Sequence, residues 1–414
     1  MITIGHPYIE EGEHEAFLFA KIKDECRDKE YIIWYSVEKG YGRYLCNDYA
    51  DAYLLLVLQW AMKSRQEIKV EAPVSSRLLF NINNTIQPLF EKMLVGSRRV
   101  AIAAIAATEP SYKAKAVGCC CSLGVDSFSS FLRHSSDAVP ADYRVTHLTL
   151  FNSGQLGHVD IEGAEQSFRS AIQSLQPFVE EVGLPLVTID TNLSEFYIDT
   201  DIKITNNDID RTISCALAMQ KLFGKYVFSS SYSVEHFTIT DDDEAHIESV
   251  FTPLLGTENM EVILSDPVMT RVEKTRYIAG YPITKKYLDV CWAVQMSNGK
   301  QYQEQGNELL RNKKKKNCGK CSKCLRTMLT LDLLGLMQQY EGQFDMDYYG
   351  THKDWFIARV LTEKEHNVSF REIAELIEEV GYGVTTKTKR KMFFMKHPYA
   401  YKIVSGIKRM IVRK

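Results

Sequence analysis

A short apolar run is followed by a helical pattern in the segment Cys121-Ser122-Leu123-Gly124-Val125-Asp126-Ser127-Phe128. Residues 116–121 form a short apolar run, as in a buried strand, and residues 125–132 have the pattern of a helix. A strand-to-helix turn of this kind exposes backbone N–H groups at the helix N-terminus, where they can bind an anion. The segment therefore predicts a phosphate-binding loop that spans residues 122–127.

The side chains of the loop support the same interpretation. Ser122 and Ser127 add hydroxyl donors, and Gly124 lets the backbone approach a phosphate closely. Leu123 and Val125 contribute their N–H groups, and Asp126 could hold Mg²⁺ through its carboxylate oxygens. The alternative is an ordinary strand-to-helix turn with a serine cap and no ligand.

Downstream of the loop, strands and helices alternate. Residues 145–151, 186–189 and 226–229 predict further strands, and residues 161–182 and 211–223 predict helices. Strands that alternate with helices indicate a Rossmann-like parallel sheet with helices on both faces, in an α/β domain over residues 111–290.

The flanking regions follow other patterns. Residues 1–110 predict an N-terminal α+β domain, with strands at 31–35 and 68–70 and helices at 51–62 and 76–93. Residues 327–414 predict a helical C-terminal region, in which Ser369 and Glu372 suggest a capping box.

The C-terminal tail is strongly basic. Residues 387–414 contain ten Lys and Arg and no Asp or Glu. The apolar residues of this tail fall on one side of an expected helix: Tyr399, Ile403, Ile407, Met410 and Ile411. Such a helix could rest on an anionic membrane, dock on a partner protein or pack onto the protein's own core.

Three cysteines at three-residue intervals, Cys318, Cys321 and Cys324, predict a metal site. Zinc binds thiolates tetrahedrally, and a structural site needs four ligands. Cys291 is the preferred fourth ligand because it lies just before the segment that leads into the triplet, and Cys215 is the second choice. Residues 291–326 would then form a zinc knuckle.

The loop resembles the SGGxDS signature of the PP-loop ATP pyrophosphatases, also called adenine nucleotide alpha hydrolases. The resemblance implies a five-stranded parallel sheet, ATP and Mg²⁺ as ligands, and adenylation of a carbonyl-type oxygen followed by displacement of AMP. The chain departs from the signature at Leu123, where the family has glycine. A leucine is costly there if the backbone requires a positive φ.

Cys291 and the triplet, placed after such a loop, resemble the 7-cyano-7-deazaguanine synthase family over residues 112–330. That family converts a carboxylate to a nitrile with ATP and ammonia, and it carries a structural Zn²⁺. In a PP-loop fold the loop at Asn152 and Gly154 lies near the adenine and ribose. The basic residues Arg271 and Lys274 follow the fourth strand and could reach the phosphates, so Lys274 joins Asp126 as a candidate for catalysis and Arg271 is a candidate for nucleotide binding. The alternative for Lys274 and Arg271 is a solvated helix face.

Composition restricts the possible functions. The net charge of −3 creates no global field for nucleic acid or a membrane, and no apolar run is long enough to span a bilayer. The start of the chain lacks a signal-peptide core, so we expect a cytoplasmic protein. His246 and Glu248, which follow an acidic run, either face a substrate pocket or lie in a solvated loop.

Several functions remain open at this stage. The first is an ATP-dependent enzyme that joins an amine to a small carboxylate or amide substrate. The second is a nucleotide-binding component without catalysis, which meets a protein partner through the N-terminal domain or the tail in a multi-gene system such as phage defence. Others are a sugar amidotransferase, a nucleic-acid-modifying PP-loop enzyme, or a nucleic-acid binder that uses the knuckle and the tail.

Overall fold

The computed structural model describes residues 1–156, 163–241, 243–291 and 317–397. They form two compact units: unit 1 runs from Met1 to Val268, and unit 2 begins at Met269. The basic tail beyond residue 397 lies outside the described residues, so its amphipathic helix stays a prediction. The domain boundaries at residues 110, 290 and 326 also stay predictions.

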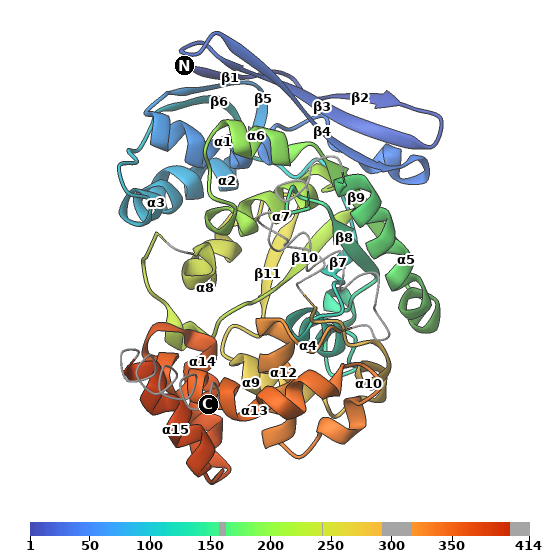
Figure 1. Ribbon diagram of the computed structural model, residues 1–414. Coiled ribbons are helices and arrows are strands. Elements are labelled where there is room, and N and C mark those ends of the chain that lie inside the picture. Colours follow the sequence, from blue (N-terminus) through green and yellow to red (C-terminus); the bar gives the residue numbers. More distant parts are fainter. Residues whose placement is uncertain (157–162, 242, 292–316, 398–414) are drawn as a thin grey trace. The chain divides into compact units, whose positions relative to one another are not determined.

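Unit 1 is built on one eleven-stranded sheet (Figure 1). Its strand order is β11-β10-β7-β8-β9-β4-β3-β1-β5-β6, and β2 pairs with β3 outside this order. Its strands are β1 (Ile2–Ile4), β2 (Tyr8–Glu11), β3 (Glu15–Asp24), β4 (Lys29–Glu38), β5 (Ile68–Ser75), β6 (Ile102–Ala107), β7 (Ala116–Cys120), β8 (His147–Phe151), β9 (Leu186–Thr191), β10 (Phe223–Ser229) and β11 (Glu261–Ser265).

The strands β11, β10, β7, β8 and β9 pair in parallel throughout. Successive residues of the central strands are buried, as with Val117 and Gly118 in β7 and Leu148 and Thr149 in β8. Because neighbouring residues of a strand point to opposite faces, both faces of this part of the sheet are covered. The expected α/β class with a mostly parallel sheet is confirmed.

The sequence did not predict that the N-terminal strands extend the same sheet. β4 pairs antiparallel with β9, with Tyr35 opposite Thr191 and Val37 opposite Ile189. β3 alternates buried and exposed residues along its length, so one face of this extension meets the core and the other meets solvent. The N-terminal segment is therefore joined to the parallel strands by backbone hydrogen bonds.

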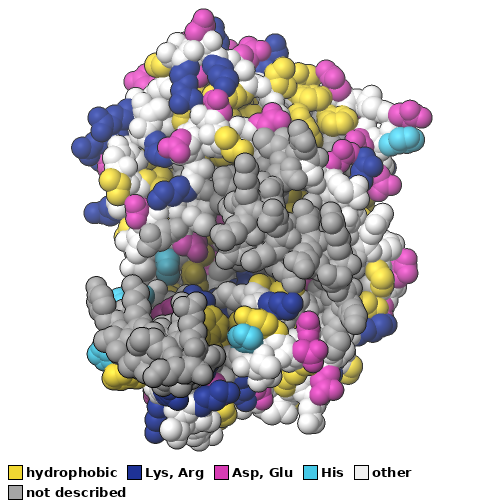
Figure 2. All heavy atoms as spheres, viewed as in Figure 1, with side chains coloured by type: hydrophobic (Ala, Val, Ile, Leu, Met, Phe, Trp, Pro, Cys, Tyr) yellow, Lys and Arg dark blue, Asp and Glu magenta, His cyan; other side chains and the backbone are white. Residues whose placement is uncertain are grey.

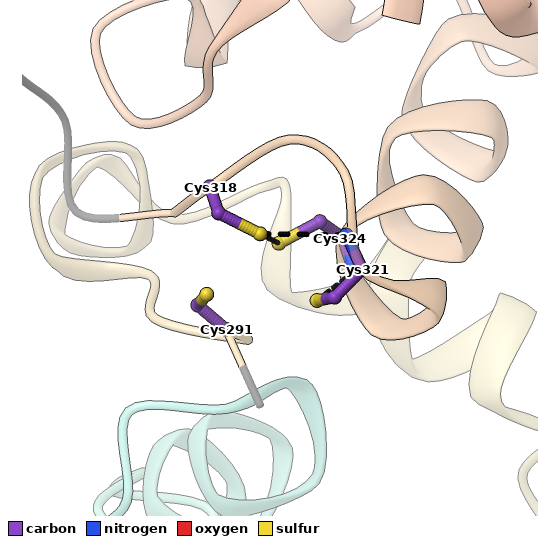
Figure 3. Close-up of side chains that lie close together, drawn as sticks. All are labelled: Cys291, Cys318, Cys321 and Cys324. Carbon is purple, nitrogen blue, oxygen red and sulfur yellow. Dashed lines mark hydrogen bonds between the residues drawn. The ribbon is translucent and has the colours of Figure 1, made fainter. Parts of the chain in front are cut away.

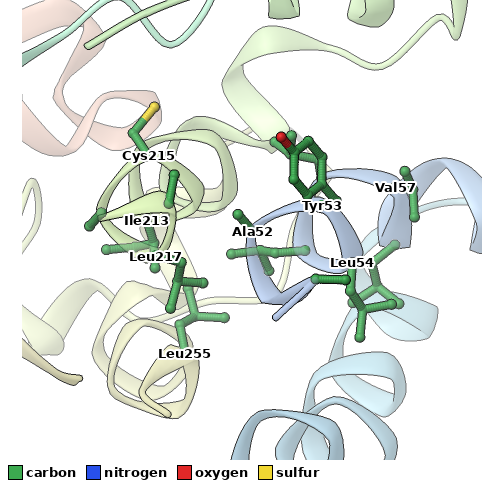
Figure 4. Packing of buried hydrophobic residues seen from close by; sticks show 14 of the residues in the cluster. Ala52, Tyr53, Leu54, Val57, Ile213, Cys215, Leu217 and Leu255 are labelled. Carbon is green, nitrogen blue, oxygen red and sulfur yellow. The ribbon is translucent and has the colours of Figure 1, made fainter. Parts of the chain in front are cut away.

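The helices of unit 1 are η1 (Lys39–Tyr44), α1 (Asp51–Ser64), α2 (Ser76–Asn81), the π-helix η2 (Ile82–Ile86), α3 (Gln87–Met93), α4 (Val125–His134), η3 (Ala141–Tyr143), α5 (Ala164–Val182), α6 (Leu193–Asp199), η4 (Ile204–Asn206), α7 (Asp208–Ala218), η5 (Val234–His236), η6 (Glu244–Ile247), α8 (Glu248–Phe251) and η7 (Thr252–Leu255). One large apolar core of unit 1 includes residues of α1, α3, α6 and α7, whereas α4 and α5 contact each other through Phe128, Phe131 and Phe178. Residues of α1 such as Leu54 and of α7 such as Ile213 meet in this core, together with Leu255 (Figure 4).

The predicted helices and strands of unit 1 are confirmed with small shifts. The helix expected at 211–223 is α7, which ends at Ala218, and Phe223 already opens β10. The segment expected as one helix over 76–93 is α2, η2 and α3 in succession. α5 ends as expected at Gly183, which adopts φ +67°.

Unit 2 is helical, as expected. Its helices are α9 (Arg271–Ile278), α10 (Pro282–Tyr287), α12 (Ser322–Leu333), η8 (Met337–Tyr340), α13 (Met346–Glu363), η9 (Lys364–His366), α14 (Val368–Glu379) and α15 (Thr386–Lys396). In the described residues, none of the helices combines the length and the apolarity that crossing a bilayer requires.

The capping box expected at Ser369 is wrong. α14 begins earlier, at Val368, and Asn367 is its N-cap, because the Asn367 side chain accepts the N–H of Phe370. Ser369 is buried and accepts a hydrogen bond of 2.6 Å from Arg326, and Glu372 accepts the N–H of Arg271. Asn and Ser are about equally good caps, so the sequence alone could not choose between them.

The surface agrees with the balanced composition. On the face of unit 1 that Figure 2 shows, Lys and Arg side chains are interspersed with Asp and Glu side chains. The charges on this face are therefore mixed and do not form the basic stripe that is typical of a nucleic-acid interface.

Candidate functional site

The phosphate-loop candidate lies at a position where α/β sheets bind ligands. β8 and β9 follow β7 on one side of the sheet, whereas β10 and β11 lie on its other side. The direction in which the chain adds strands thus reverses between β7 and β10. Ligands of open α/β sheets bind outside the carboxyl ends of the strands at such a switch point. Residues 122–127 leave β7 at this place.

The backbone of Leu123 adopts the left-handed conformation, with φ +57°. Glycine enters this region freely, whereas a leucine costs about 1–2 kcal/mol there. Leu123 therefore takes the conformation that a glycine would favour at this position. Its side chain is 2% exposed, while Ser122 is exposed and Gly124 is half-buried. The leucine side chain is therefore buried in the protein and does not lie at its surface.

The loop leads directly into α4, whose N-cap is Gly124. Gly124 has no side chain, so it cannot cap the N–H groups of the first turn. The two serines brace the turn: Ser127 donates to the carbonyl of Gly124 at 3.3 Å, and Ser122 donates to Ser127 at 3.1 Å. The N–H of Gly124 makes a long contact of 3.4 Å with Ser122. The turn thus places two hydroxyl groups beside the backbone N–H groups at the start of α4.

Asp266, which sequence reasoning missed, positions α4 from the end of β11. Its carboxylate accepts a hydrogen bond of 2.6 Å from Ser129 and forms an ion pair with Arg133. Asp266 also adopts a positive φ of +56°, so two strained residues flank this edge of the sheet. Strain of this kind is typical of functional sites. A lone Asp after a strand carries no pattern that would have identified it.

Asn152 and Gly154 lie at the carboxyl end of β8, the strand next to β7. Asn152 donates to Asp190 at 2.6 Å, and its Oδ1 has no hydrogen-bond partner among the described residues. Burial raises the pKa of Asp190 above its ordinary value. Gly154 has φ +100°, and a Cβ there would lie 3.1 Å from the N atom of Ser194. This loop shares an edge of the sheet with residues 122–127, and its contact with a nucleotide stays a prediction.

Asp126, Lys274 and Arg271 are the remaining candidates for catalysis and nucleotide binding. Asp126 is half-buried in the first turn of α4, in unit 1. Lys274 and Arg271 lie on α9 in unit 2. Lys274 is 1% exposed, so it does not lie on a solvated helix face, whereas Arg276 on the same helix is exposed and pairs with Glu379. The proposed roles of these residues stay predictions.

His246 and Glu248 are not part of a solvated loop. The Glu248 carboxylate is buried and accepts the N–H groups of Ser231 and Tyr232, both at 2.7 Å. The ring of His246 stacks on that of Tyr232, with 4.7 Å between the centroids. Both residues hold the chain that follows β10, so they shape the same edge of the sheet.

The structure brings Cys291, Cys318, Cys321 and Cys324 together in unit 2 (Figure 3). All four sulfurs lie within 4.8 Å of one another, and those of Cys318 and Cys324 are 3.8 Å apart. A tetrahedral ion at about 2.3 Å from each sulfur would separate them by about 3.8 Å. Cys215, the second choice for a ligand, is buried on α7 of unit 1. The four-cysteine cluster is compatible with zinc.

The backbone around the cluster favours thiolates. The N–H groups of Lys320 and Cys321 point to the sulfur of Cys318, at 3.4 and 3.3 Å, and Cys321 is the N-cap of α12. Hydrogen bonding with Cys291 lowers the pKa of Cys318 to about 7 and also lowers that of Cys321, while the pKa of Cys324 is raised. Four thiolates this close repel one another, so the fully deprotonated set requires a cation.

Two further residues shape the cluster. Gly319 has φ +66°, and a Cβ there would lie 2.1 Å from the carbonyl oxygen of Asp345. Asn317 is fully buried and joins the two chain segments that carry the cysteines: it accepts the N–H of Val290 and donates to the carbonyls of Leu288 and Gln343. The Asn–Cys–Gly order was visible in the sequence, but the partners of Asn317 were not.

The cysteines that precede the loop are not candidate nucleophiles. Cys119 and Cys121 are buried, and burial raises the pKa of Cys120 to about 11. A thiol with a raised pKa is a poor nucleophile at neutral pH. These cysteines serve as small apolar residues of the buried strand and its end.

Comparison of the chain with protein-family models, with curated proteins and with solved structures gave no match. The geometry of the loop and of the cysteine cluster is therefore the basis for a functional assignment.

Proposed function

We propose that the chain binds ATP at residues 122–127 and uses it to activate a small carboxylate or amide. In this reaction the substrate oxygen attacks the α-phosphorus and pyrophosphate leaves. Ammonia or an amine then attacks the activated carbon, and AMP leaves with the oxygen. The resemblance to the PP-loop pyrophosphatases and to the 7-cyano-7-deazaguanine synthase family supports this reaction class.

One observation carries the proposal: the loop leaves the central strand at the switch point with Leu123 in the left-handed conformation. A left-handed residue before a helix turns successive N–H groups toward one point, and such a concave arrangement binds phosphate oxygens. Because the donors are backbone groups, the leucine side chain does not remove them. Positioning and charge neutralisation supply most of the catalysis in reactions of this kind.

The remaining residues have defined tasks in this proposal. Asp126 would hold Mg²⁺, which supplies charge neutralisation for the phosphates. On binding, the hydroxyl groups of Ser122 and Ser127 would exchange their present acceptors for phosphate oxygens, and Asn152 would offer its free amide oxygen to the nucleoside. The cysteine cluster would hold Zn²⁺ as a structural ion, since four sulfur ligands leave no open position for a substrate.

The proposal is tested by incubating the zinc-replete protein with ATP, Mg²⁺, ammonium and a panel of carboxylic acids and primary amides. We expect AMP and pyrophosphate in equal amounts with at least one acceptor. Absence of both products, together with absence of ATP binding by calorimetry, would contradict the proposal.

A matched pair of variants connects the activity to the loop. Gly124→Ala places a methyl group where the phosphates would approach, and the φ of −76° at this position accepts alanine without strain. We expect at least a tenfold loss of ATP affinity with little change in stability. Ser135→Ala, at the opposite end of α4, should bind ATP as the wild type does.

A second candidate function is a nucleotide-binding component that depends on a protein partner. The leucine at a strained position, where the related enzymes have glycine, favours it. ATP binding without AMP formation across the panel would support this alternative over the enzyme.

A further inference from the structure

A second polar cluster lies in unit 1, inside the core between α1 and α7. We call it the oxygen cluster, and its side chains are Gln59, Asn206, Asn207, Asp210 and Glu244. Each of these residues is at most 7% exposed. They come from four places in the chain: α1, η4 with the residue that follows it, α7 and η6.

Hydrogen bonds hold the members of the oxygen cluster against one another. The Gln59 amide donates to Asp210 Oδ2 at 2.7 Å and to the carbonyl of Asn206. The backbone N–H of Asp210 donates to Glu244 Oε1 at 3.3 Å. Two buried carboxyl groups and a carboxamide therefore meet at the first turn of α7.

The remaining oxygens of the cluster lack donors. Within the described part of the chain, no hydrogen-bond partner is present for Gln59 Oε1, Asn206 Oδ1, Asn207 Oδ1, Asp210 Oδ1 and Glu244 Oε2. Buried oxygens without a partner are rare, and each costs about 1–3 kcal/mol. Gln59 Oε1 belongs to the same amide group whose nitrogen donates to Asp210 Oδ2.

A single shared proton would not satisfy this set. A proton between Asp210 and Glu244 would supply one donor to the two carboxyl groups, and it would leave the amide oxygens of the cluster without a partner. A hard cation accepts carboxylate and amide oxygens alike, and Ca²⁺ and Mg²⁺ take six or more oxygen ligands. Water molecules could supply the remaining oxygen ligands of such an ion.

The surrounding charges also favour a cation. Asp208 and Asp243 lie close enough to act on Glu244 electrostatically, and the buried Arg211 pairs with Asp208. Tyr197 is buried near Asp210 and is uncharged at neutral pH, as tyrosine ordinarily is, and burial raises its pKa further. Besides burial, the charges of Asp210, Asp208 and Asp243 raise the pKa of Glu244, and a bound cation would relieve this repulsion.

We propose that the oxygen cluster is a buried binding site for one divalent, oxygen-liganded cation of the Mg²⁺ or Ca²⁺ class. The ion would join α1 of the N-terminal segment to α7 and η6. This site is separate from the phosphate loop and from the cysteine cluster, and it does not depend on the proposed reaction.

Proton release gives the site a recognisable signature. Burial raises the pKa of Asp210 to about 8, whereas an unfolded Asp has a pKa of about 3.9. Without the cation the folded state holds a proton that the unfolded state has lost, so stability falls as the pH rises from about 4 to about 8. A bound cation replaces that proton, and its effect on stability therefore grows with pH.

The test uses the zinc-replete protein without nucleotide, freed of other ions on a chelating resin. Adding Ca²⁺ or Mg²⁺ at about a hundred times its Kd should raise the Tm of unit 1 by about 5 °C at pH 8. Native mass spectrometry should then count one ion besides zinc. A wild-type protein without this added ion and without a cation-dependent Tm would overturn the proposal, and a pH dependence that the cation leaves unchanged would identify a shared proton instead.

Variants locate the ion. The double variant D210N/E244Q removes both charges and should lose the extra ion and the Tm response to the cation. D201N changes a fully exposed Asp in the same segment and should keep both. If the double variant retains the ion, the site lies elsewhere and the proposal is wrong. The wild-type measurement decides the question even if the double variant does not fold.

Discussion

The phosphate loop and the cysteine cluster are both tight turns before a helix, but they present different atoms. In the cysteine cluster the ligands are side chains, and the backbone of Gly319 only permits the turn. In the loop the donors are mostly backbone N–H groups, and the side chain of Leu123 is directed into the protein. Replacing a cysteine changes the chemistry of its site, whereas the leucine in the loop preserves the donors at the cost of strain.

This difference explains what each turn requires of its sequence. A site made of side chains depends on residue type, and a site made of backbone groups depends on conformation. We therefore expect the cysteine cluster to be sensitive to ligand removal and to added bulk, and the loop to be sensitive mainly to local strain. The following predictions test this contrast in order of decreasing effect.

Loss of the metal should have the largest effect. Cys318→Ser, or chelation of the bound ion, should remove the cooperative unfolding of unit 2 or lower its stability by several kcal/mol, because metal binding at such sites is coupled to folding. Calorimetry with and without chelator measures this. Cys26→Ser, at an exposed cysteine, is the control and should have no effect. Unfolding that is insensitive to chelator would show that the thiols hold no structural ion.

Gly319→Ala should cost about 4 kcal/mol, because the added Cβ collides with the Asp345 carbonyl and the backbone has a positive φ. Gly335→Ala is a matched control: Gly335 has φ +71° but open space around it, so the cost should be about 1 kcal/mol. Denaturant unfolding of the two variants gives the comparison. Equal losses would mean that conformation alone, and not the collision, makes Gly319 necessary.

Asn317→Ala should destabilise unit 2 by about 3 kcal/mol, because it removes three hydrogen bonds, two of which are buried and join the two cysteine-bearing segments. Gln343→Ala removes one exposed hydrogen bond, to the carbonyl of Lys286, and should cost under about 1 kcal/mol. Zinc affinity should fall in the first variant and stay unchanged in the second. An unchanged zinc affinity in both variants would show that Asn317 does not help to hold the cysteine cluster together.

Substitution of Leu123 should have the smallest effect on stability, and this effect should be specific to the backbone conformation. Leu123→Ala and Leu123→Gly both lose the buried side chain, but only glycine relieves the left-handed strain. The glycine variant should therefore be more stable than the alanine variant by about 1 kcal/mol, the reverse of the usual order in helices and strands. Thermal unfolding of unit 1 measures the difference. The usual order would indicate that the turn is not strained in solution.

The sequence predicted the parallel sheet because alternating apolar runs and helical patterns are local signals. It did not predict the pairing of β4 with β9, which joins Tyr35 to Thr191 across more than a hundred residues through backbone groups. The same limit applies to the sites. The cysteines were found by their spacing, whereas Asn317, Asp266 and the oxygen cluster owe their roles to partners that only the folded chain brings near.

The central claim is that backbone amides of the loop bind the phosphates of a nucleotide. It is tested most directly by a crystal structure of the protein with Mg²⁺ and a non-hydrolysable ATP analogue. The account predicts phosphate oxygens within about 3.2 Å of amide nitrogens in residues 123–127. An analogue bound with its phosphates away from this loop, or a loop that stays empty at millimolar analogue, would contradict it.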